Sequence, residues 1–116
     1  MNLSDLMDRT LLLDLETTRS GKIRQVGAVL NRHIFERTEK GGSKAVLEQL
    51  DELAQKADFV LGHNLLGHDF PILRAASPWL KILKKPVIDT LYLSPLAFPQ
   101  NPYHRLVKNY KLVRST

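Results

Sequence analysis

The stretch Thr10-Leu-Leu-Leu-Asp-Leu-Glu-Thr-Thr18 decides which fold the chain is expected to adopt. It begins as a short apolar run ending in the carboxylate of Asp14, which is typical of a buried central strand whose C-terminal end opens into a crevice. Because side chains alternate along a strand, Asp14 and Glu16 project to the same side. Two such carboxylates repel each other and lose hydration, so the pattern favours a bound divalent cation. Taken alone, a D-x-E is equally typical of a solvated strand end.

A second segment with a carboxylate is His63-Asn-Leu-Leu-Gly-His-Asp69, which follows another apolar strand expected over residues 58–62. Asp69 supplies a third acid for the candidate cation site. By itself it also fits a helix N-cap ahead of Pro71. His63 by itself also fits a strand-end histidine whose ring bonds to backbone.

The remaining elements follow from periodicity and turn residues. Ser43 is a plausible N-cap for the clearest helix, and Pro71 fits only in the first turn of the next one. The order β-β-β-α-β-α-β-α indicates an α/β domain of three layers with a mixed central sheet. The further strands are expected over 22–30, 33–38 and 86–89, and the helices over 43–56, 69–76, 90–97 and 103–113.

The composition indicates one globular domain over residues 1–116, with 43% apolar and 25% charged residues. Zero cysteines exclude disulfides and thiolate ligands, so a metal must be held by oxygen or imidazole, which favours Mg²⁺ or Mn²⁺. No window approaches the ~20 apolar residues of a membrane span, and residues 1–10 lack a signal core. We therefore expect a cytoplasmic protein with no membrane partner.

The charge is distributed unevenly along the chain. Residues 1–69 carry 9 Lys and Arg against 11 Asp and Glu, whereas residues 70–116 carry 8 against 1, so the net charges are −2 and +7. A basic half beside an acidic half suits a polyanionic substrate, although a solvated basic surface would look the same. The basic residues of the second half are Arg74, Lys81, Lys84, Lys85, Arg105, Lys108, Lys111 and Arg114.

The two carboxylate segments, in this order and spacing, resemble the DnaQ-like 3′→5′ exonucleases of the DEDD superfamily. The resemblance covers about residues 10–113. Among the members of this family, the chain is similar to exonuclease domains fused to RecQ-type helicases. It implies an RNase H-like fold, four acids (Asp-Glu-Asp-Asp) that hold two metal ions, and a His or Tyr general base just before the fourth acid. The segments that carry it are LLLDLETT (11–18), KIRQVGAVL (22–30), LGHNLLGHDFPIL (61–73) and PVIDTLYLSPLAFP (86–99).

Residue by residue, the resemblance implies that Asp14, Glu16 and Asp69 hold two ions, Mg²⁺ or Mn²⁺, that activate water and stabilise the leaving 3′ oxygen. The implied substrate is the 3′ end of a nucleic acid, taken here as single-stranded DNA. Contacts to the 2′-OH, which distinguish RNA, leave no pattern in this sequence. The positions that match the lining of the nucleotide site are Thr17, Thr18, His63 and Asn64.

The third motif of the family, H-x-x-x-x-D or Y-x-x-x-D, has no match because no aspartate follows Asp89. Three interpretations remain open. In the first, the chain ends before the motif and its C-terminal helix is missing. In the second, Asn109 stands in place of the fourth acid, with His104 as the base. In the third, His104 and Asn109 are coincidental in a noncatalytic domain. In each case a ligand charge is absent, so this chain alone is expected to be a weak enzyme or an inactive one.

Three function classes follow: a metal-dependent exonuclease, a degenerate exonuclease-fold module that binds nucleic acid or a protein, and a generic α/β domain. Arg105 and Lys108 are expected to hold phosphates of the incoming strand, and Tyr103 or Tyr110 could stack bases. A missing C-terminal helix would leave one sheet face uncovered, which a helicase domain, a partner chain or a second copy could cover.

Overall fold

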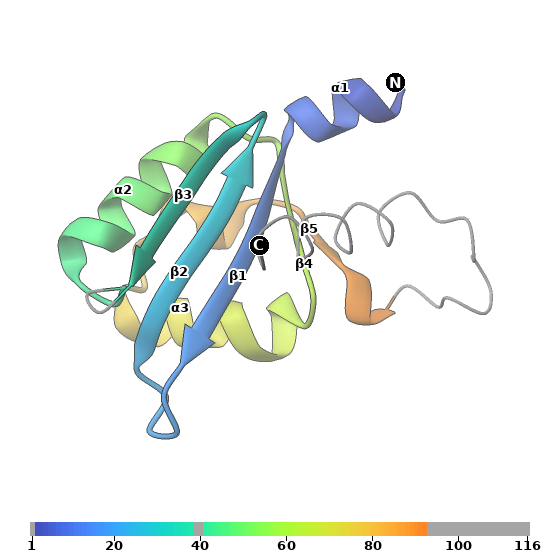
Figure 1. Ribbon diagram of the computed structural model, residues 1–116. Coiled ribbons are helices and arrows are strands. Elements are labelled where there is room, and N and C mark those ends of the chain that lie inside the picture. The colour runs from blue at the N-terminus through green and yellow to red at the C-terminus, as the bar shows by residue number, and fades with distance from the viewer. Residues whose placement is uncertain (1, 39–40, 93–116) are drawn as a thin grey trace.

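The computed structural model describes residues 2–38 and 41–92, which form a five-stranded mixed sheet (Figure 1). The strand order is β3-β2-β1-β4-β5. The first three strands along the chain pair antiparallel, whereas β4 and β5 run parallel to β1. The expected α/β class with a mixed sheet is confirmed. The strands are β1 (Thr10–Thr17), β2 (Ile23–Leu30), β3 (His33–Thr38), β4 (Phe59–Gly62) and β5 (Val87–Asp89).

Six helical segments complete the described part of the chain. Two of them were expected at nearly these positions, α2 (Lys44–Gln55) and α3 (Phe70–Ala76). None of the six is long and apolar enough to cross a bilayer. The other four are α1 (Leu3–Asp8), the π-helical turn η1 (Leu65–Asp69) and the 3₁₀ turns η2 (Lys81–Lys84) and η3 (Thr90–Tyr92).

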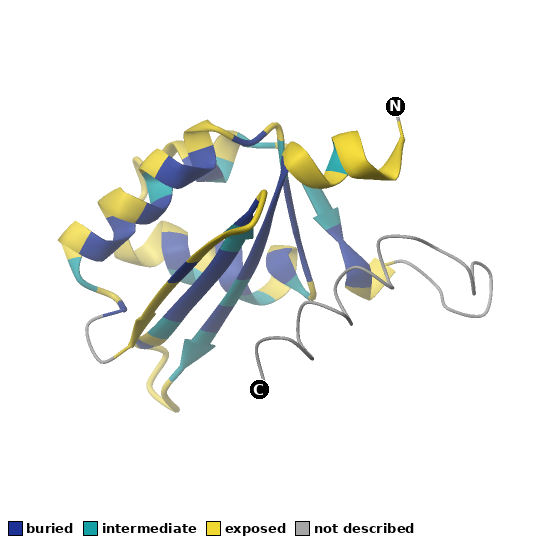
Figure 2. Cartoon of the chain, turned by 45° about the horizontal axis from the view of Figure 1, so that its top comes forward, coloured by how far each residue is buried: buried dark blue, intermediate teal, exposed yellow. Residues whose placement is uncertain are grey.

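Helices α2 and α3 cover one face of the sheet. Ser43 caps α2 as expected, since its hydroxyl accepts the Val46 N–H at 3.2 Å. The buried side of α2 packs against β1, β2 and β4 in one apolar core (Figure 2). Helix α1 lies at the start of β1, where Ser4 and Met7 border a hollow with Leu12. The β1 residues that belong to the core are Leu11, Leu13 and Leu15.

Close approach of β1 and β4 explains one glycine. A Cβ on Gly62 would lie 2.5 Å from the carbonyl oxygen of Leu13, which belongs to the backbone and cannot move aside. Only glycine therefore lets β4 end against β1 at this point. This contact brings the loop after β4 to the edge of β1, where the carboxylates lie.

Strand β1 is longer than expected. It continues through Thr17, with a register shift against β2 between Glu16 and Thr17. Asp14 therefore lies inside the strand, three residues before its end. Residue alternation still holds along this extension, and it determines where the two acids project.

Candidate carboxylate site

Asp14 and Glu16 share the face of β1 that points away from the helices. Their neighbours Leu13 and Leu15 are buried in the core, so alternation places the two carboxylates on the opposite face. Both acids are partly exposed. Glu16 accepts a hydrogen bond from Arg24 Nη2 at 3.1 Å, an ion pair between two largely exposed side chains. The D-x-E pattern thus produces the shared side that the sequence predicted.

Asp69 reaches the same strand from the loop beyond β4. Its Oδ2 accepts the backbone N–H of Leu15 at 2.9 Å, and the side chain is almost fully buried. The β1–β4 ladder extends only to Leu12 paired with Leu61, so the Leu15 N–H lies past the end of β4 and would otherwise lack a strand partner. Asp69 occupies the N-cap position of α3, as the helix interpretation expected, but its side chain makes no capping bond to that helix.

Burial raises the pKa of Asp69 above its ordinary value of 3.8, because removal from water disfavours the charged form. The hydrogen bonds from His68 and from the Leu15 N–H oppose this rise. The negative charge of Asp14 adds to it, which shows that the two carboxylates are close enough to interact. A cation bound nearby would favour the charged form and oppose this rise.

His68 connects Asp69 to the end of β1, and sequence reasoning missed it. Its Nδ1 lies 3.0 Å from Asp69 Oδ1, and its Nε2 lies 3.4 Å from the Thr17 hydroxyl. With Nδ1–H donating to the carboxylate, Nε2 accepts from Thr17. The signal was present in the sequence, since His68 directly precedes Asp69 inside the second motif.

The other predicted nucleotide-site residues have structural partners. His63 is exposed and places Nδ1 3.0 Å from the Thr90 hydroxyl, so the expectation of a backbone partner for its ring is not met. Asn64 adopts a left-handed conformation with φ 58°, and a Cβ on Gly67 would lie 2.5 Å from its Oδ1. The Thr18 hydroxyl accepts the Lys22 N–H inside the β1–β2 turn.

The carboxylate of Asp89, at the end of β5, accepts hydrogen bonds from several backbone N–H groups. Its Oδ1 accepts the N–H groups of Asn64 and Leu91 at 2.7 and 3.1 Å, and its Oδ2 accepts that of Leu66 at 3.0 Å. Asp89 is buried and holds η1 in place at the C-terminal ends of β4 and β5. These bonds give both carboxylate oxygens of Asp89 a structural role.

The donor chemistry of Asp14, Glu16 and Asp69 suits a hard divalent ion, but the geometry does not close around one. In the described part of the chain, no three His, Asp or Glu side chains are grouped closely enough to hold a metal. That Asp14, Glu16 and Asp69 share one cation stays a prediction. The further predicted site residues, His104, Arg105, Lys108 and Asn109, lie outside the described residues.

Three of the predicted phosphate-binding residues lie at the end of the sheet opposite to the carboxylates. Lys81, Lys84 and Lys85 precede β5, whereas the carboxylates are near the C-terminal ends of the parallel strands. Lys85 donates to the carbonyl of Ala57, just before β4. Their side chains therefore gather away from the acids.

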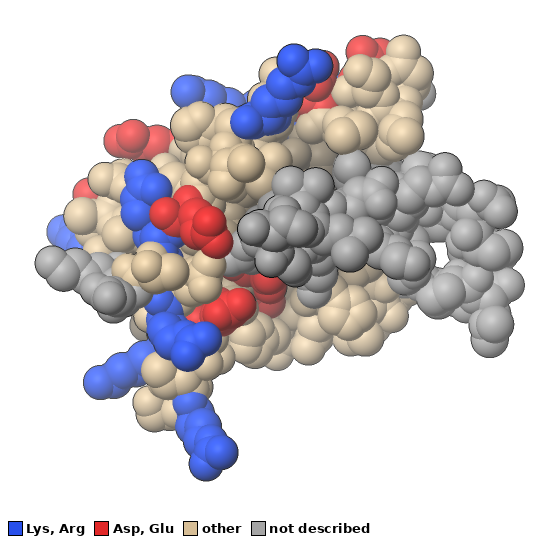
Figure 3. All heavy atoms as spheres, viewed as in Figure 1, with Lys and Arg blue, Asp and Glu red and all other residues tan. Residues whose placement is uncertain are grey.

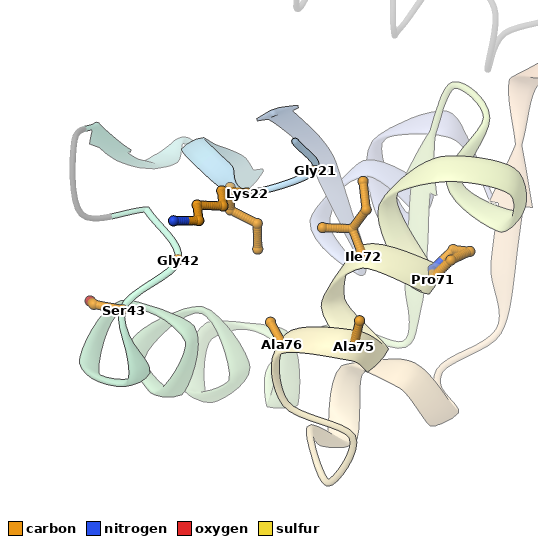
Figure 4. A pocket seen from close by; sticks show the side chains of 9 residues that line it. Gly21, Lys22, Gly42, Ser43, Pro71, Ile72, Ala75 and Ala76 are labelled. Atoms are coloured by element: carbon orange, nitrogen blue, oxygen red, sulfur yellow. The ribbon is translucent and has the colours of Figure 1, made fainter. Parts of the chain in front are cut away.

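A hollow of about 600 Å³ lies on the helix side of the sheet, between the β1–β2 turn, the start of α2 and α3 (Figure 4). Ile72, Ala75 and Ala76 line it from α3, and Lys22 and Gly42 line it from the opposite side. None of the three site acids lines it. The hollow is therefore separate from the carboxylate site.

No protein-family model and no curated protein sequence matches this chain. The function must therefore be argued from the motif residues and from the positions that the fold gives them.

Proposed function

We propose that this chain is a DnaQ-like 3′→5′ exonuclease domain that hydrolyses phosphodiester bonds at nucleic-acid 3′ ends, with single-stranded DNA as the substrate. The observation that carries the proposal is the bond from the Leu15 N–H to Asp69 Oδ2. Through it, a residue 54 positions away joins the strand that presents Asp14 and Glu16. A generic α/β domain has no reason to bury an acid at that point.

The fold supports the same assignment. A mixed sheet with three antiparallel strands followed by two strands parallel to the first is compatible with the RNase H-like architecture that the resemblance implies. The acids lie near the C-terminal end of β1, close to the edge of the sheet where ligands bind in such folds.

The residue roles follow from position. Asp14, Glu16 and Asp69 would hold Mg²⁺ or Mn²⁺, which when bound supplies an activated water and stabilises the leaving oxygen. Asp69 is oriented by the Leu15 N–H and by His68, so its carboxylate does not have to reorganise. Thr17, held by His68, faces the same end of β1 and is suited to contact the terminal nucleotide.

A second candidate function is a catalytically degenerate module that binds nucleic acid. It is favoured by the ion pair between Arg24 and Glu16, which already neutralises one acid, and by the lack of a three-ligand cluster in the described residues. Both candidate functions use the C-terminal end of β1. A measurement of catalytic turnover distinguishes them.

The test is incubation of the pure chain with a 5′-labelled single-stranded DNA in Mg²⁺ or Mn²⁺, with stepwise shortening of the labelled strand as the readout. We expect weak, metal-dependent shortening from the 3′ end that Asp14→Asn abolishes and that Glu48→Gln, an exposed acid on α2, leaves intact. An RNA of the same sequence, run in parallel, decides the sugar preference.

The outcomes are distinct. DNA binding with no shortening supports the degenerate module. Robust turnover in the wild type would show that the chain supplies a fourth ligand. Neither binding nor turnover, or shortening that persists in Asp14→Asn, rejects the assignment.

A further inference from the structure

The connection between β1 and β2 is positively charged and lies directly beyond the two exposed acids. Residues 18–24, here called the basic turn, contain Arg19, Lys22 and Arg24 and no acid. All three cationic side chains are exposed. Figure 3 shows Lys and Arg projecting from the end of the molecule where the β1–β2 turn lies in Figure 1, with Asp and Glu beside them.

The basic turn is held in a defined conformation. The Thr18 N–H donates to the Lys22 carbonyl at 2.8 Å, and the Gly21 N–H donates to the Thr18 carbonyl at 3.0 Å. The Thr18 hydroxyl also lies 2.9 Å from that of Ser20, and Gly21 supplies the φ of 86° that the turn requires. The charges are therefore displayed on a fixed support, which reduces the entropy lost when a ligand binds.

The three cations differ in their surroundings. Arg24 pairs with Glu16, which ties the turn to the carboxylate site. Arg19 and Lys22 form no ion pair within residues 2–38 and 41–92, and Lys22 lies on the side of the turn that faces Gly42 (Figure 4). Two positive charges thus remain for an external anion on the turn that follows Glu16 and Thr17 along the chain.

We propose that the basic turn binds the phosphate backbone of the single-stranded nucleic acid whose 3′ end reaches Asp14 and Glu16. The inference rests on the proposed function, and it assigns the phosphate contacts to Arg19 and Lys22 instead of to the lysines before β5. Repulsion between the acids and a phosphate would oppose substrate approach, and cations on the turn at the same end of the sheet offset it. Lys81 and Lys84 cannot do so from the opposite end of the sheet.

The experiment measures binding of a fluorescent oligo-dT by the full chain in EDTA, by anisotropy, over a range of NaCl concentrations. Each phosphate neutralised on a single strand contributes about −0.7 to the slope of log affinity against log salt. The double variant Arg19→Ala with Lys22→Ala should therefore bind more weakly and lose up to about 1.4 from the magnitude of that slope. The matched control, Lys81→Ala with Lys84→Ala, removes the same charge and should change the slope by less than half as much.

Circular dichroism of both double variants checks that the fold is retained, and Arg24 is left in place so that Glu16 keeps its partner. The inference is overturned if the two double variants lose equal slope, if the control loses more, or if the wild type does not bind the oligonucleotide. It is also overturned if polyglutamate competes as well as the oligonucleotide at equal charge, since the turn would then be an unspecific anion surface. Because EDTA removes turnover from the assay, binding through the turn stands even if the chain proves not to be a nuclease.

Discussion

Asp69 is the residue at which the fold and the proposed chemistry meet. Its carboxylate satisfies the Leu15 N–H, which has no partner in β4, and this bond makes the side chain part of the fold. The same position is buried, so ionisation of the carboxylate opposes folding while the site lacks a cation. A residue placed for packing alone would be expected to be uncharged here.

We therefore expect the free energy of unfolding to depend on pH through the ionisation of Asp69. The raised pKa means that folded Asp69 binds its proton more tightly than the unfolded chain does. Its contribution is therefore favourable below the ordinary pKa and is lost as the pH rises through the folded pKa. In Asp69→Asn this loss is absent, because the amide oxygen can still accept the Leu15 N–H and carries no charge.

We expect the free energy of unfolding of Asp69→Asn, relative to the wild type, to increase as the pH is raised from about 3.5 to 7.5. Urea denaturation in EDTA at several pH values measures it, and the other carboxylates cancel because both proteins contain them. A difference that stays constant or decreases over this range would show that Asp69 is not buried as a charged group.

At the scale of elements, local patterns were sufficient wherever the sequence neighbours decide the structure. Ser43 caps α2 as expected, and the strands begin within one residue of the predicted positions. The π-helical turn η1 was not predicted, because its backbone is held by the carboxylate of Asp89, 23 residues after Leu66. A contact over that separation has no local signature, which also explains why the bond from the Leu15 N–H to Asp69 could not be predicted.

Asp89 should therefore contribute more to the free energy of unfolding than an acid that accepts fewer backbone hydrogen bonds. Asp89→Ala leaves three part-buried donors without their acceptor, and we expect a loss of roughly 2–4 kcal/mol in the free energy of unfolding. The control is Asp51→Ala, which removes the bonds from the N–H groups of Lys81 and Ile82 at a more exposed position. It should cost about 0.5–1.5 kcal/mol.

Urea denaturation of both variants gives the comparison. Equal losses would mean that water replaces the Asp89 bonds at little cost, and η1 would then not depend on this residue.

At the scale of the whole molecule, the charge pattern along the chain only partly predicts the charge pattern in space. The sequence separates an acidic half from a basic half, and the sheet does present acids at one end. However, the topology returns the chain to the opposite end before β5, so Lys81, Lys84 and Lys85 lie far from those acids. The cations that do lie beside the acids belong to the acidic half, because β1 and β2 are joined by a short turn.

The full set of metal ligands is a property of the whole molecule, and its strength can be measured as stabilisation by metal. A ligand that binds only the folded state adds RT ln(1 + [L]/Kd) to the free energy of unfolding, which is about 0.4 kcal/mol when the concentration equals Kd. With three acids that do not close around an ion, we expect Kd near the millimolar range. About 1 mM Mn²⁺ should then raise the Tm by only a few degrees, since about 1 kcal/mol shifts the Tm of a domain of this size by roughly 4–8 °C.

Thermal unfolding followed by circular dichroism, with and without Mn²⁺, gives the shift. Asp14→Asn and Glu16→Gln should abolish it, because each removes a ligand charge from the exposed face of β1. Glu48→Gln should retain it, since that acid lies on α2 and pairs with Lys44. A shift above about 10 °C in the wild type would indicate a complete, tight site and would contradict the weak binding expected here. A shift of equal size in Asp14→Asn would show that the ion binds elsewhere, and the assignment of the carboxylates at the end of β1 as the metal site would then be wrong.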